Sequence, residues 1–486
     1  MATDRLARGD QLMRLLEAQG CTHAVRLGET PAAGGLGVFA TRDLKAGDVV
    51  MRCPTSALLR PSDVDADVTL ASAIAELSRR SGLQIDERQR LQLLLLHERH
   101  RLGAGQPTVW GAYIESLPAR ELVDALPLSW SPADLERRAR GTALFSEVPE
   151  ARSGLSALER EVRRNAPLFG GSAGAFSMEG LEWAHAVFWS RALVLDLPGR
   201  TECLVPLLDL CNHRAGATTE LRVAAGCFEL RAGRSLRCGD EVLINYGAKG
   251  NAELLRCHGF VLPDNQADVC PLELSRLALA AGQTEELCRR EHEARLGLLR
   301  ELRLADRPFL FHGGLPERLL PAARLLCAPT AADLRAAREA LDGTAAGSLE
   351  EAAPFDWNSV DWTQDDPFEG CDEDDDSPLS AVGERATTEA LVSLLSQSRD
   401  AIAEPSAEEE RQLTEACASA SGGVKSGGGG ADLAALVYRS GQRALLEEAR
   451  SRLQRRLDRL LIGGRKREGA AVEHGGEKAS RPAACR

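Results

Sequence analysis

The segment LVPLLDLCNHRAGATTE, residues 204–220, constrains the fold more than any other, because an apolar run ends directly in a polar cluster. A run so rich in leucine must lie in a core, and a buried polar group that lacks a partner costs roughly 1–3 kcal/mol. Asp209, Asn212 and His213 stand at the end of this run. We therefore expect Asn212 and His213 to have either a structural partner or a ligand.

The length of the chain predicts a multidomain protein, since 486 residues can form two or three domains with a substantial core. No apolar run approaches the roughly 20 residues needed to span a bilayer, and the first twenty residues lack the apolar core of a secretory signal. The 13 cysteines include no CxxC pair, which is typical of thiols kept reduced. We expect a cytoplasmic or nuclear protein with no membrane partner.

The negative charge of the chain is concentrated in one segment. Residues 342–385 contain fourteen acidic residues and one basic residue, so this segment alone accounts for the net charge of −13. The remainder is close to neutral and shows no basic face, so we expect no nucleic-acid partner. The acidic segment and the stretch SGGVKSGGGG at 421–430 both predict flexible loops.

Two short motifs are weak when each is taken alone. GLGVFA at 35–40 matches the dinucleotide-binding pattern G-x-G-x-x-A, but a strand and a turn follow it where that pattern needs a helix. Its glycines predict either a turn or a backbone exposed to close approach by a ligand. HERH at 97–100 has histidines three residues apart rather than four, which favours the solvated face of a leucine-rich helix.

Single residues near the segment 204–220 are also ambiguous. Tyr246 by itself is typical of a core tyrosine with a satisfied hydroxyl, and Arg191 is typical of a helical salt bridge. We predict no metal site, because the candidate ligands have spacings that fit no common zinc pattern. Those candidates are Cys203, Cys211, His213 and Cys227.

Taken together, the motifs resemble those of the SET-domain protein methyltransferases in order and spacing. The matching segments are GGLGVFATRDLKAGDVV, WSRAL, VPLLDLCNH and GDEVLINYGAKGNAELLRCHGFV. They are most similar to the branch typified by the Rubisco large-subunit lysine methyltransferase. VWGAYIESLP resembles the helical insert of that branch, and LPERLLPAARLLC and LAALVYRSGQRALLEEA resemble its C-terminal helical domain.

The resemblance implies an α+β fold, with a β-rich SET core, a knot-like crossing and a helical insert, followed by a mainly α-helical C-terminal domain. The implied domains are an N-terminal helix at 1–20, a SET domain at 21–262 with its insert at about 60–185, a helical substrate-binding domain at 270–460, and a disordered tail at 461–486. The acidic segment 342–385 would interrupt the helical domain as a disordered insert. We expect a monomer.

The resemblance also implies S-adenosylmethionine as the cofactor and assigns residues to it. Asn212 and His213 would contact the adenine, which would give the polar end of the segment 204–220 its ligand. Arg191 would pair with the cofactor carboxylate through a charge-assisted contact. The backbone along the methionine part of the cofactor would be that of Gly35, Leu36 and Gly37.

Tyr246 corresponds to the tyrosine that lies beside the transferring methyl group in the family, so we predict that it is catalytic and contacts the cofactor. Asp209 is a candidate for contact with the substrate, and a structural role is the alternative. The chain departs from many relatives at His258, which stands where they have a tyrosine. An aromatic hydroxyl often found near the cofactor is therefore absent.

The resemblance predicts a protein-lysine N-methyltransferase that acts on a non-histone protein presenting a lysine. Family members that methylate histidine have an asparagine shortly after the arginine of the helix motif, whereas Ala192 and Leu193 follow here, which favours lysine. Two alternatives remain open: a protein-histidine N-methyltransferase of the same fold, and a catalytically silent SET-like binding module.

Overall fold

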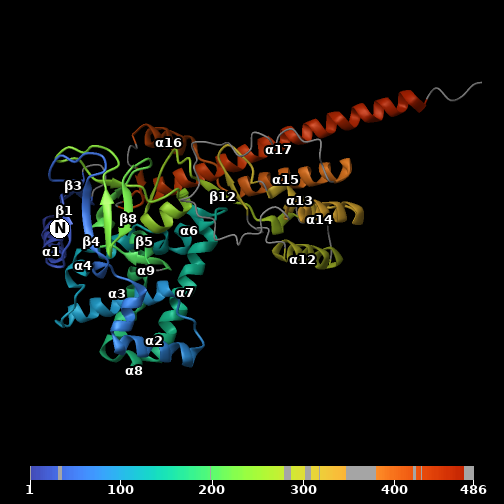
Figure 1. Cartoon of the computed structure of the whole chain (residues 1–486). Helices are drawn as coiled ribbons and strands as arrows, with labels where there is room; N and C mark the ends of the chain where they lie inside the picture. The colour runs from blue at the N-terminus through green and yellow to red at the C-terminus, as the bar shows by residue number, and fades with distance from the viewer. Residues whose placement is uncertain are drawn as a thin grey trace, which may run out of the picture. The chain divides into compact units, whose positions relative to one another are not determined.

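The computed structural model of the chain is drawn in Figure 1 and contains two compact units. The first unit comprises Met1–Arg138, Leu144–Asp264 and Arg411–Val437, and the second comprises Ala139–Ala143, Asn265–Glu410 and Tyr438–Arg486. The residues that the structure describes are 2–30, 35–197, 199–277, 286–301, 308–316, 318–345, 379–419, 423–427 and 429–475.

The first unit contains a four-stranded antiparallel sheet. Its order is β1-β4-β9-β8, so β4 pairs with a strand that follows the whole helical insert. β4 has the sequence VVMRCP and buries Val50, Met51 and Cys53, as expected for a strand rich in apolar residues. The tight turn before it uses Gly47 at φ 87°, a conformation that favours glycine. The strands are β1 Thr22–His23, β4 Val49–Pro54, β8 Glu220–Ala224 and β9 Cys227–Arg231.

Smaller pairings complete the β-rich part of the first unit. Two are antiparallel hairpins, β2 with β3 and β5 with β6, and β7 pairs in parallel with β10. The strand β7 is the Asn-His dipeptide at the polar end of the leucine-rich run. The bounds are β2 Val25–Thr30, β3 Gly35–Ala40, β5 Ala192–Leu197, β6 Gly199–Leu204, β7 Asn212–His213 and β10 Leu243–Ile244.

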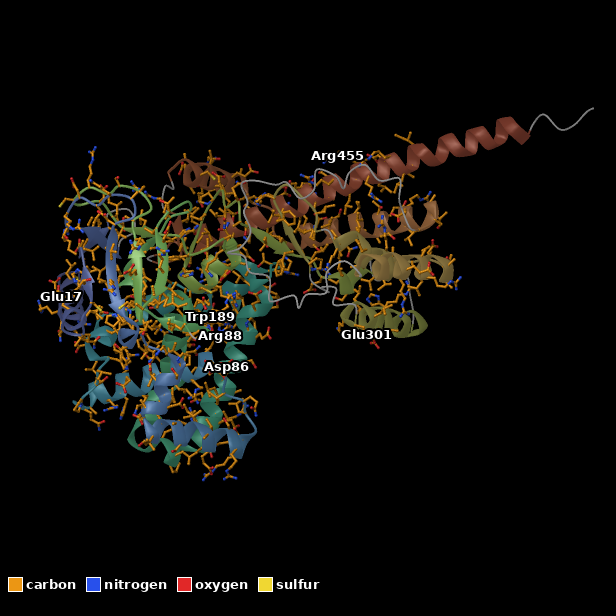
Figure 2. The ribbon with its side chains drawn as sticks, viewed as in Figure 1. Glu17, Asp86, Arg88, Trp189, Glu301 and Arg455 are labelled. Carbon is orange, nitrogen blue, oxygen red and sulfur yellow. The ribbon has the colours of Figure 1, made fainter. Side chains whose placement is uncertain are left out.

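The helical insert lies between β4 and β5. Its longest leucine-rich helix, α3, begins at a capping box in which Asp86 and Gln89 satisfy each other's backbone N–H groups. Arg88 of α3 lies over the ring of Trp189 at 4.9 Å (Figure 2), which ties α3 to α9. The helices are η1 Thr55–Ala57, η2 Pro61–Ala66, α2 Val68–Ser81, α3 Glu87–Gly103, α4 Gly111–Ser116, α5 Arg120–Asp124, η3 Pro127–Ser129, α6 Pro132–Ala139, α7 Leu144–Arg164, α8 Ala166–Phe169, η4 Gly170–Phe176 and α9 Met178–Arg191.

The second unit is mainly helical around its own leucine-rich core. Leu325, Leu391 and Leu446 are buried in that core, each on a different helix. The elements are β12 Val269–Pro271, η7 Leu274–Arg276, α12 Glu286–Glu301, β13 Phe309–Phe311, α13 Leu319–Cys327, α14 Ala331–Ala345 and α15 Ala381–Ala401, together with parts of α16 Ala407–Ser419 and α17 Ala431–Gly475. A strand-containing first unit with a helical insert, followed by this helical region, confirms the predicted α+β class.

The chain returns to the first unit through Arg411–Val437, a return that helical periodicity alone does not reveal. Within it, β14 Val424–Lys425 pairs with β11 Phe260–Val261, which follows α10 Asn251–Glu253 and η6 Leu254–His258. The interpretation of SGGVKSGGGG as a flexible loop is therefore wrong for residues 424–426, because backbone hydrogen bonds hold them against Gly259, Phe260 and Val261. Residues 420–422 and 428 lie outside the described residues.

Two of the sequence-based boundaries differ from the structure. Of the acidic segment 342–385, residues 346–378 lie outside the described residues, while its last residues belong to α15. Glu384, one of the acidic residues of the predicted disordered insert, is instead buried in α15, with ion pairs to Arg324 at 2.8 Å and Arg456 at 3.1 Å. At the C-terminus α17 continues to Gly475, through residues expected to be a disordered tail, and 476–486 lie outside the described residues.

N-terminal to the β-rich part lies α1 Ala2–Ala18, which contributes Leu12 and Leu16 to the core of the first unit. Among the described helices, none is both long enough and apolar enough to cross a membrane.

The burial of Glu384 generates a stability prediction. Glu384→Gln removes the negative charge of a side chain that is 2% exposed and that compensates the charges of Arg324 and Arg456, so the free energy of unfolding should fall by about 3–5 kcal/mol. Glu389→Gln is the matched control on the same helix, since Glu389 is 49% exposed and pairs with the exposed Arg385. It should cost no more than about 1 kcal/mol. Urea denaturation of the three proteins measures both, and equal stabilities would contradict the prediction.

Candidate functional site

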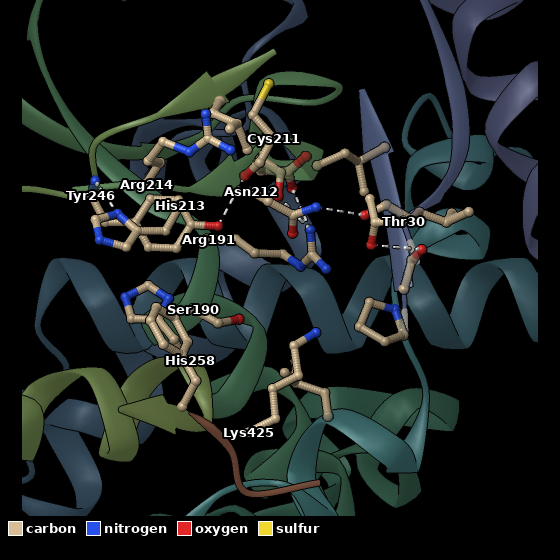
Figure 3. A pocket seen from close by; sticks show the side chains of 18 of the residues that line it. Thr30, Ser190, Arg191, Cys211, Asn212, His213, Arg214, Tyr246, His258 and Lys425 are labelled. Carbon is tan, nitrogen blue, oxygen red and sulfur yellow. Dashed lines mark hydrogen bonds and ion pairs between the residues drawn. The ribbon is translucent and has the colours of Figure 1, made fainter. Parts of the chain in front are cut away.

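A cavity of about 320 Å³ lies within the first unit (Figure 3). It is the meeting point of segments that are far apart in the sequence, from the β2–β3 hairpin to β14. The residues that line it are Thr30, Gly35, Leu36, Ser116, Pro118, Leu122, Ser190, Arg191, Asp209, Leu210, Cys211, Asn212, His213, Arg214, Glu241, Leu243, Tyr246, His258, Phe260 and Lys425.

A buried charge network forms one wall of the cavity. Asp209 lies in the short helix η5 Leu208–Leu210, and its carboxylate is 0% exposed. It accepts a hydrogen bond from the Tyr113 hydroxyl at 2.6 Å and lies 3.5 Å from Nη1 of Arg191, which also donates to the Asp209 carbonyl oxygen at 2.8 Å. Burial raises the pKa of Asp209, and Arg191 and Tyr113 oppose this rise. The network therefore holds the guanidinium of Arg191, the last residue of α9, at the cavity wall.

Asn212 of β7 connects β3 with Glu241, which precedes β10. Its Nδ2 donates to the Leu36 carbonyl oxygen at 3.3 Å and to Oε1 of Glu241 at 2.8 Å. Gly37 lies against the same group: a Cβ there would come within 2.4 Å of Thr30 Cγ2 and 2.6 Å of Glu241 Oε1. Any side chain at Gly37 would force this junction apart, so the glycine is required by close approach.

His213 and Tyr246 are held against each other by one backbone contact. The Tyr246 N–H donates to Nδ1 of His213 at 3.1 Å, and the Tyr246 hydroxyl donates to the Cys211 carbonyl oxygen at 2.9 Å. Nδ1 is therefore the unprotonated nitrogen of a neutral imidazole. Burial raises the pKa of the Tyr246 hydroxyl, which consequently stays protonated and can act as a donor.

An aromatic cluster surrounds this pair. The His258 ring lies 4.7 Å from that of Tyr246, and the Phe260 ring lies 5.9 Å from that of His213. Burial lowers the pKa of His213 to about 4 and that of His258 to about 3, with Lys249 contributing to both. Both histidines are therefore neutral at pH 7.

The structure brings the candidate residues of the sequence analysis to one site. Gly35, Leu36, Arg191, Asp209, Asn212, His213 and Tyr246 all line the cavity, and Gly37 packs against it. Their individual roles stay predictions. For Asp209, a fully buried carboxylate bound by Tyr113 and Arg191 favours the structural alternative over contact with a substrate.

Several residues of the site are not identified from the sequence, among them Tyr113, Glu241 and Lys425. Tyr113 lay in a segment recognised only as part of the insert, and Glu241 in a strand–turn–strand pattern. Lys425 stands between runs of glycine, which were interpreted as a loop. A Val-Lys dipeptide between glycines is too short a signal to predict a strand.

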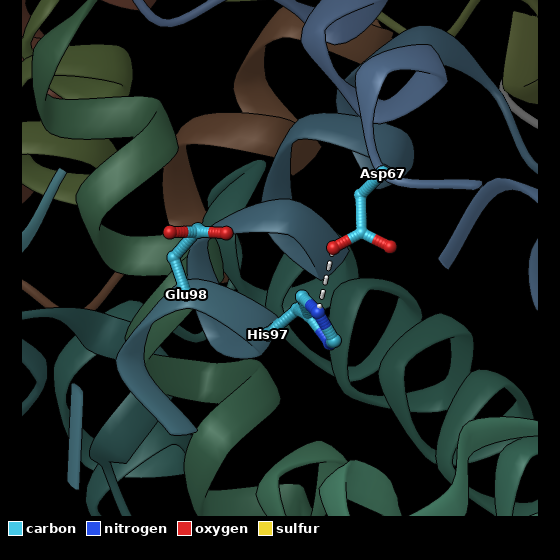
Figure 4. Close-up of side chains that lie close together, drawn as sticks. All are labelled: Asp67, His97 and Glu98. Atoms are coloured by element: carbon cyan, nitrogen blue, oxygen red, sulfur yellow. Dashed lines mark hydrogen bonds and ion pairs between the residues drawn. The ribbon is translucent and has the colours of Figure 1, made fainter. Parts of the chain in front are cut away.

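A separate group of possible metal ligands lies on the helical insert (Figure 4). Nε2 of His97 lies 3.1 Å from Oδ2 of Asp67, which caps α2, and Glu98 is adjacent. Arg101 lies within 3.4 Å of Asp67 and 3.2 Å of Glu98, and Thr108 also donates to Glu98. The carboxylates are thus already engaged by protein donors, and the group is an ion-pair network that fastens α2 to α3.

Known proteins share sequence and fold with this chain. The SET domain family model matches residues 35–247. The chain is 30% identical over 257 residues to the chloroplastic ribulose-1,5-bisphosphate carboxylase/oxygenase large subunit N-methyltransferase of Nicotiana tabacum, covering 49% of this chain and 48% of that protein. It is 27% identical over 314 residues to SET domain-containing protein 4 of Mus musculus, covering 60% of this chain and 66% of that protein. The chain thus spans about half to two thirds of these relatives.

Among solved structures, Rubisco LSMT bound to AdoMet has a similar fold. The TM-score is 0.65 at 20% sequence identity, covering 93% of each chain. Because the match covers 93% of this chain, the shared fold includes the helical second unit as well as the SET domain.

The lowered histidine pKa values generate a prediction about stability and pH. The unfolded chain protonates each histidine below about pH 6.5, whereas folded His258 does so only near pH 3. Unfolding therefore takes up a proton in this window, so the free energy of unfolding falls as the pH drops below 6.5. The decrease between pH 7 and pH 5, measured by urea denaturation, should be smaller in His258→Gln by roughly 1–2 kcal/mol. His100→Gln, outside the cavity, is the control, and parallel curves for all three proteins would refute the assignment.

Proposed function

We propose that this chain, in which residues 35–247 form a SET domain, is an S-adenosylmethionine-dependent protein methyltransferase that acts on lysine. The observation that carries the proposal is the convergence on one cavity of Leu36, Arg191, Asn212, His213 and Tyr246. The names of relatives support it, since the Nicotiana tabacum protein is a large-subunit N-methyltransferase and a Xenopus laevis relative, 24% identical over 303 residues, is an N-lysine methyltransferase.

The polar atoms of the cavity fit such a cofactor. Nε of Arg191 and Nε2 of His258 are buried and have no hydrogen-bond partner in the described part of the chain, so each can bind a ligand without losing a protein contact. Gly37 lets Thr30 and Glu241, which both line the cavity, pack closely against β3. Asn212 and His213 would hold the adenine, and Arg191 would hold the carboxylate.

When bound, S-adenosylmethionine supplies an electrophilic methyl group on a sulfonium. The acceptor nitrogen must present a lone pair. Deprotonation of a lysine with a pKa near 10.4 costs about 4.6 kcal/mol at pH 7. A partly enclosed cavity lowers that cost, because removal of water disfavours the ammonium form.

Tyr246 is the group that would orient the acceptor. Its hydroxyl is protonated and held by the Cys211 carbonyl oxygen at 2.9 Å, so it acts by position rather than as a base. No dedicated general base is needed, because desolvation of the acceptor supplies the free amine. The neutral rings of His213 and His258 add no positive charge that would repel a cationic substrate.

The preference for lysine over histidine rests on the residues after Arg191. Ala192 and Leu193 stand there, without the asparagine of the histidine-methylating relatives. A relative from Canis lupus familiaris, 27% identical over 258 residues, is named an actin-histidine N-methyltransferase, so the experiment must distinguish the two acceptors.

A proteome incubated with the protein and isotopically labelled S-adenosylmethionine tests the proposal. We expect labelled methyl groups on lysine side chains of a protein, identified by mass spectrometry. Label on histidine would overturn the lysine assignment but would still support a protein methyltransferase. Cofactor binding without any transferred label would favour a silent binding module.

Tyr246→Phe tests the role of the hydroxyl. The ring packing remains, so stability should change by about one hydrogen bond, roughly 1 kcal/mol. Methyl transfer should fall at least tenfold while cofactor affinity stays nearly unchanged, because positioning acts in the transition state. Labelled methyl incorporation, cofactor titration and a thermal melt measure the three quantities.

The matched control is Tyr438→Phe, which removes a hydroxyl from a buried tyrosine of the second unit. This variant should keep its turnover per folded molecule. Normal turnover in the Tyr246→Phe protein would falsify the catalytic role of Tyr246, whereas a large loss in the Tyr438→Phe protein would show that the assay reports folding.

A further inference from the structure

We propose that Lys425 binds the carboxylate of the cofactor together with Arg191, so that the returning segment Arg411–Val437 is part of the cofactor site. The inference rests on the proposed function, because it assumes S-adenosylmethionine as the ligand. It adds a residue from far outside the matched SET domain, which ends at residue 247.

The backbone of β14 directs Lys425 into the cavity. Lys425 stands opposite Phe260 in the antiparallel pair of β14 and β11, and the Ser426 N–H donates to the Gly259 carbonyl oxygen at 2.8 Å. Opposite residues of an antiparallel pair project from the same face. Both Lys425 and Phe260 line the cavity, and Figure 3 shows the amino end of Lys425 directed toward the side of the site that holds Arg191.

The glycines around Lys425 are required by this close packing. Gly423 has φ 86°, and a Cβ there would lie 2.9 Å from the Val261 carbonyl oxygen. A Cβ at Gly430 would lie 2.1 Å from the carbonyl oxygen of Lys425 itself. The segment is thus a tightly packed turn that presents the side chain of Lys425 to the cavity. Its glycines are needed because other residues would clash with neighbouring backbone atoms.

The charges in the cavity explain what a lysine there can recognise. Asp209 is bound by Arg191 and Tyr113, and Glu241 accepts from Asn212. Burial lowers the pKa of Lys425, and the negative charge of Glu241 opposes this. The cofactor carries two positive groups, its sulfonium and its ammonium, and one negative group. Glu241 lines the same cavity and favours a cation at Lys425, and the cofactor carboxylate would add a second negative partner for it.

Arg191 alone would not fully compensate the charge of the cofactor carboxylate. Its Nη1 donates to the Asp209 carbonyl oxygen and faces the Asp209 carboxylate, so part of its charge is already compensated within the protein. The ammonium of Lys425 is a compact charge on a flexible stem and can follow the carboxylate as it enters.

Calorimetric titration of the full chain with two ligands tests the proposal. S-adenosylmethionine has the carboxylate, and decarboxylated S-adenosylmethionine lacks it but keeps the adenosine and the sulfonium. We expect Lys425→Met to weaken binding of S-adenosylmethionine by tenfold or more and to change binding of the decarboxylated ligand by less than about twofold. Lys425→Arg, which keeps a cation, should lie between wild type and Lys425→Met. Lys45→Met, in an exposed turn, should bind both ligands like wild type.

The outcomes are distinguishable from each other. Equal losses for both ligands in the Lys425→Met protein, or no loss for either, would overturn the carboxylate contact, and retained binding of the decarboxylated ligand proves that the variant is folded. Failure of the wild type to bind either ligand would overturn the proposed function itself.

A second readout addresses the alternative that Lys425 is the methyl acceptor. In that reaction the Lys425 nitrogen would form a bond to the methyl carbon as the carbon–sulfur bond breaks, S-adenosylhomocysteine would leave, and the lysine proton would pass to solvent. The chain contains five lysines, so peptide mass spectrometry after incubation with S-adenosylmethionine locates any methyl group. An unmodified Lys425 supports the carboxylate contact, and a methylated Lys425 overturns it.

Discussion

The carboxylate of Asp209 is the group on which the geometry of the cavity depends. It is fully buried and shared between the Tyr113 hydroxyl on α4 and the guanidinium of Arg191 at the end of α9. Removal of one member of a buried, hydrogen-bonded charge group leaves an uncompensated charge and costs several kcal/mol. Because Asp209 lies just before Asn212 and His213, the same contact orients the helical insert and the two short strands β7 and β10 relative to each other.

The rest of the site combines restricted backbones with neutral side chains. Gly37 allows Asn212, Thr30 and Glu241 to meet, and the β11–β14 pair closes the wall that carries Phe260 and Lys425. Tyr246, His213 and His258 are uncharged at neutral pH because burial disfavours their ionised forms. A cavity of this kind suits chemistry in which a nucleophile is desolvated and positioned, and in which no side chain needs to exchange a proton.

Several features could be predicted because their signals are local. The alternation of short apolar runs and glycine turns indicates the strands near β3 and β4, and leucine periodicity indicates α3. The motif order indicates that Arg191, Asn212 and Tyr246 belong to one site. Glu384 shows the limit of such reasoning: in sequence it is one more acid in an acidic segment, but Arg324 and Arg456 come to it from other helices. Only long-range packing reveals a buried ion pair.

Periodicity and burial costs act on neighbouring residues, so the local pattern indicates the leucine-rich run that must be buried and the polar residues at its end that need partners. The α+β class is what the resemblance to the SET-domain family implies. Which partners the polar residues have depends on the folded arrangement of distant segments. Asn212 donates hydrogen bonds to Glu241 and Leu36, and Asp209 accepts one from Tyr113. Lys425 lines the cavity from a strand only two residues long. Such contacts join segments up to 176 residues apart, and their formation depends on how the whole core packs, a property that no local pattern encodes.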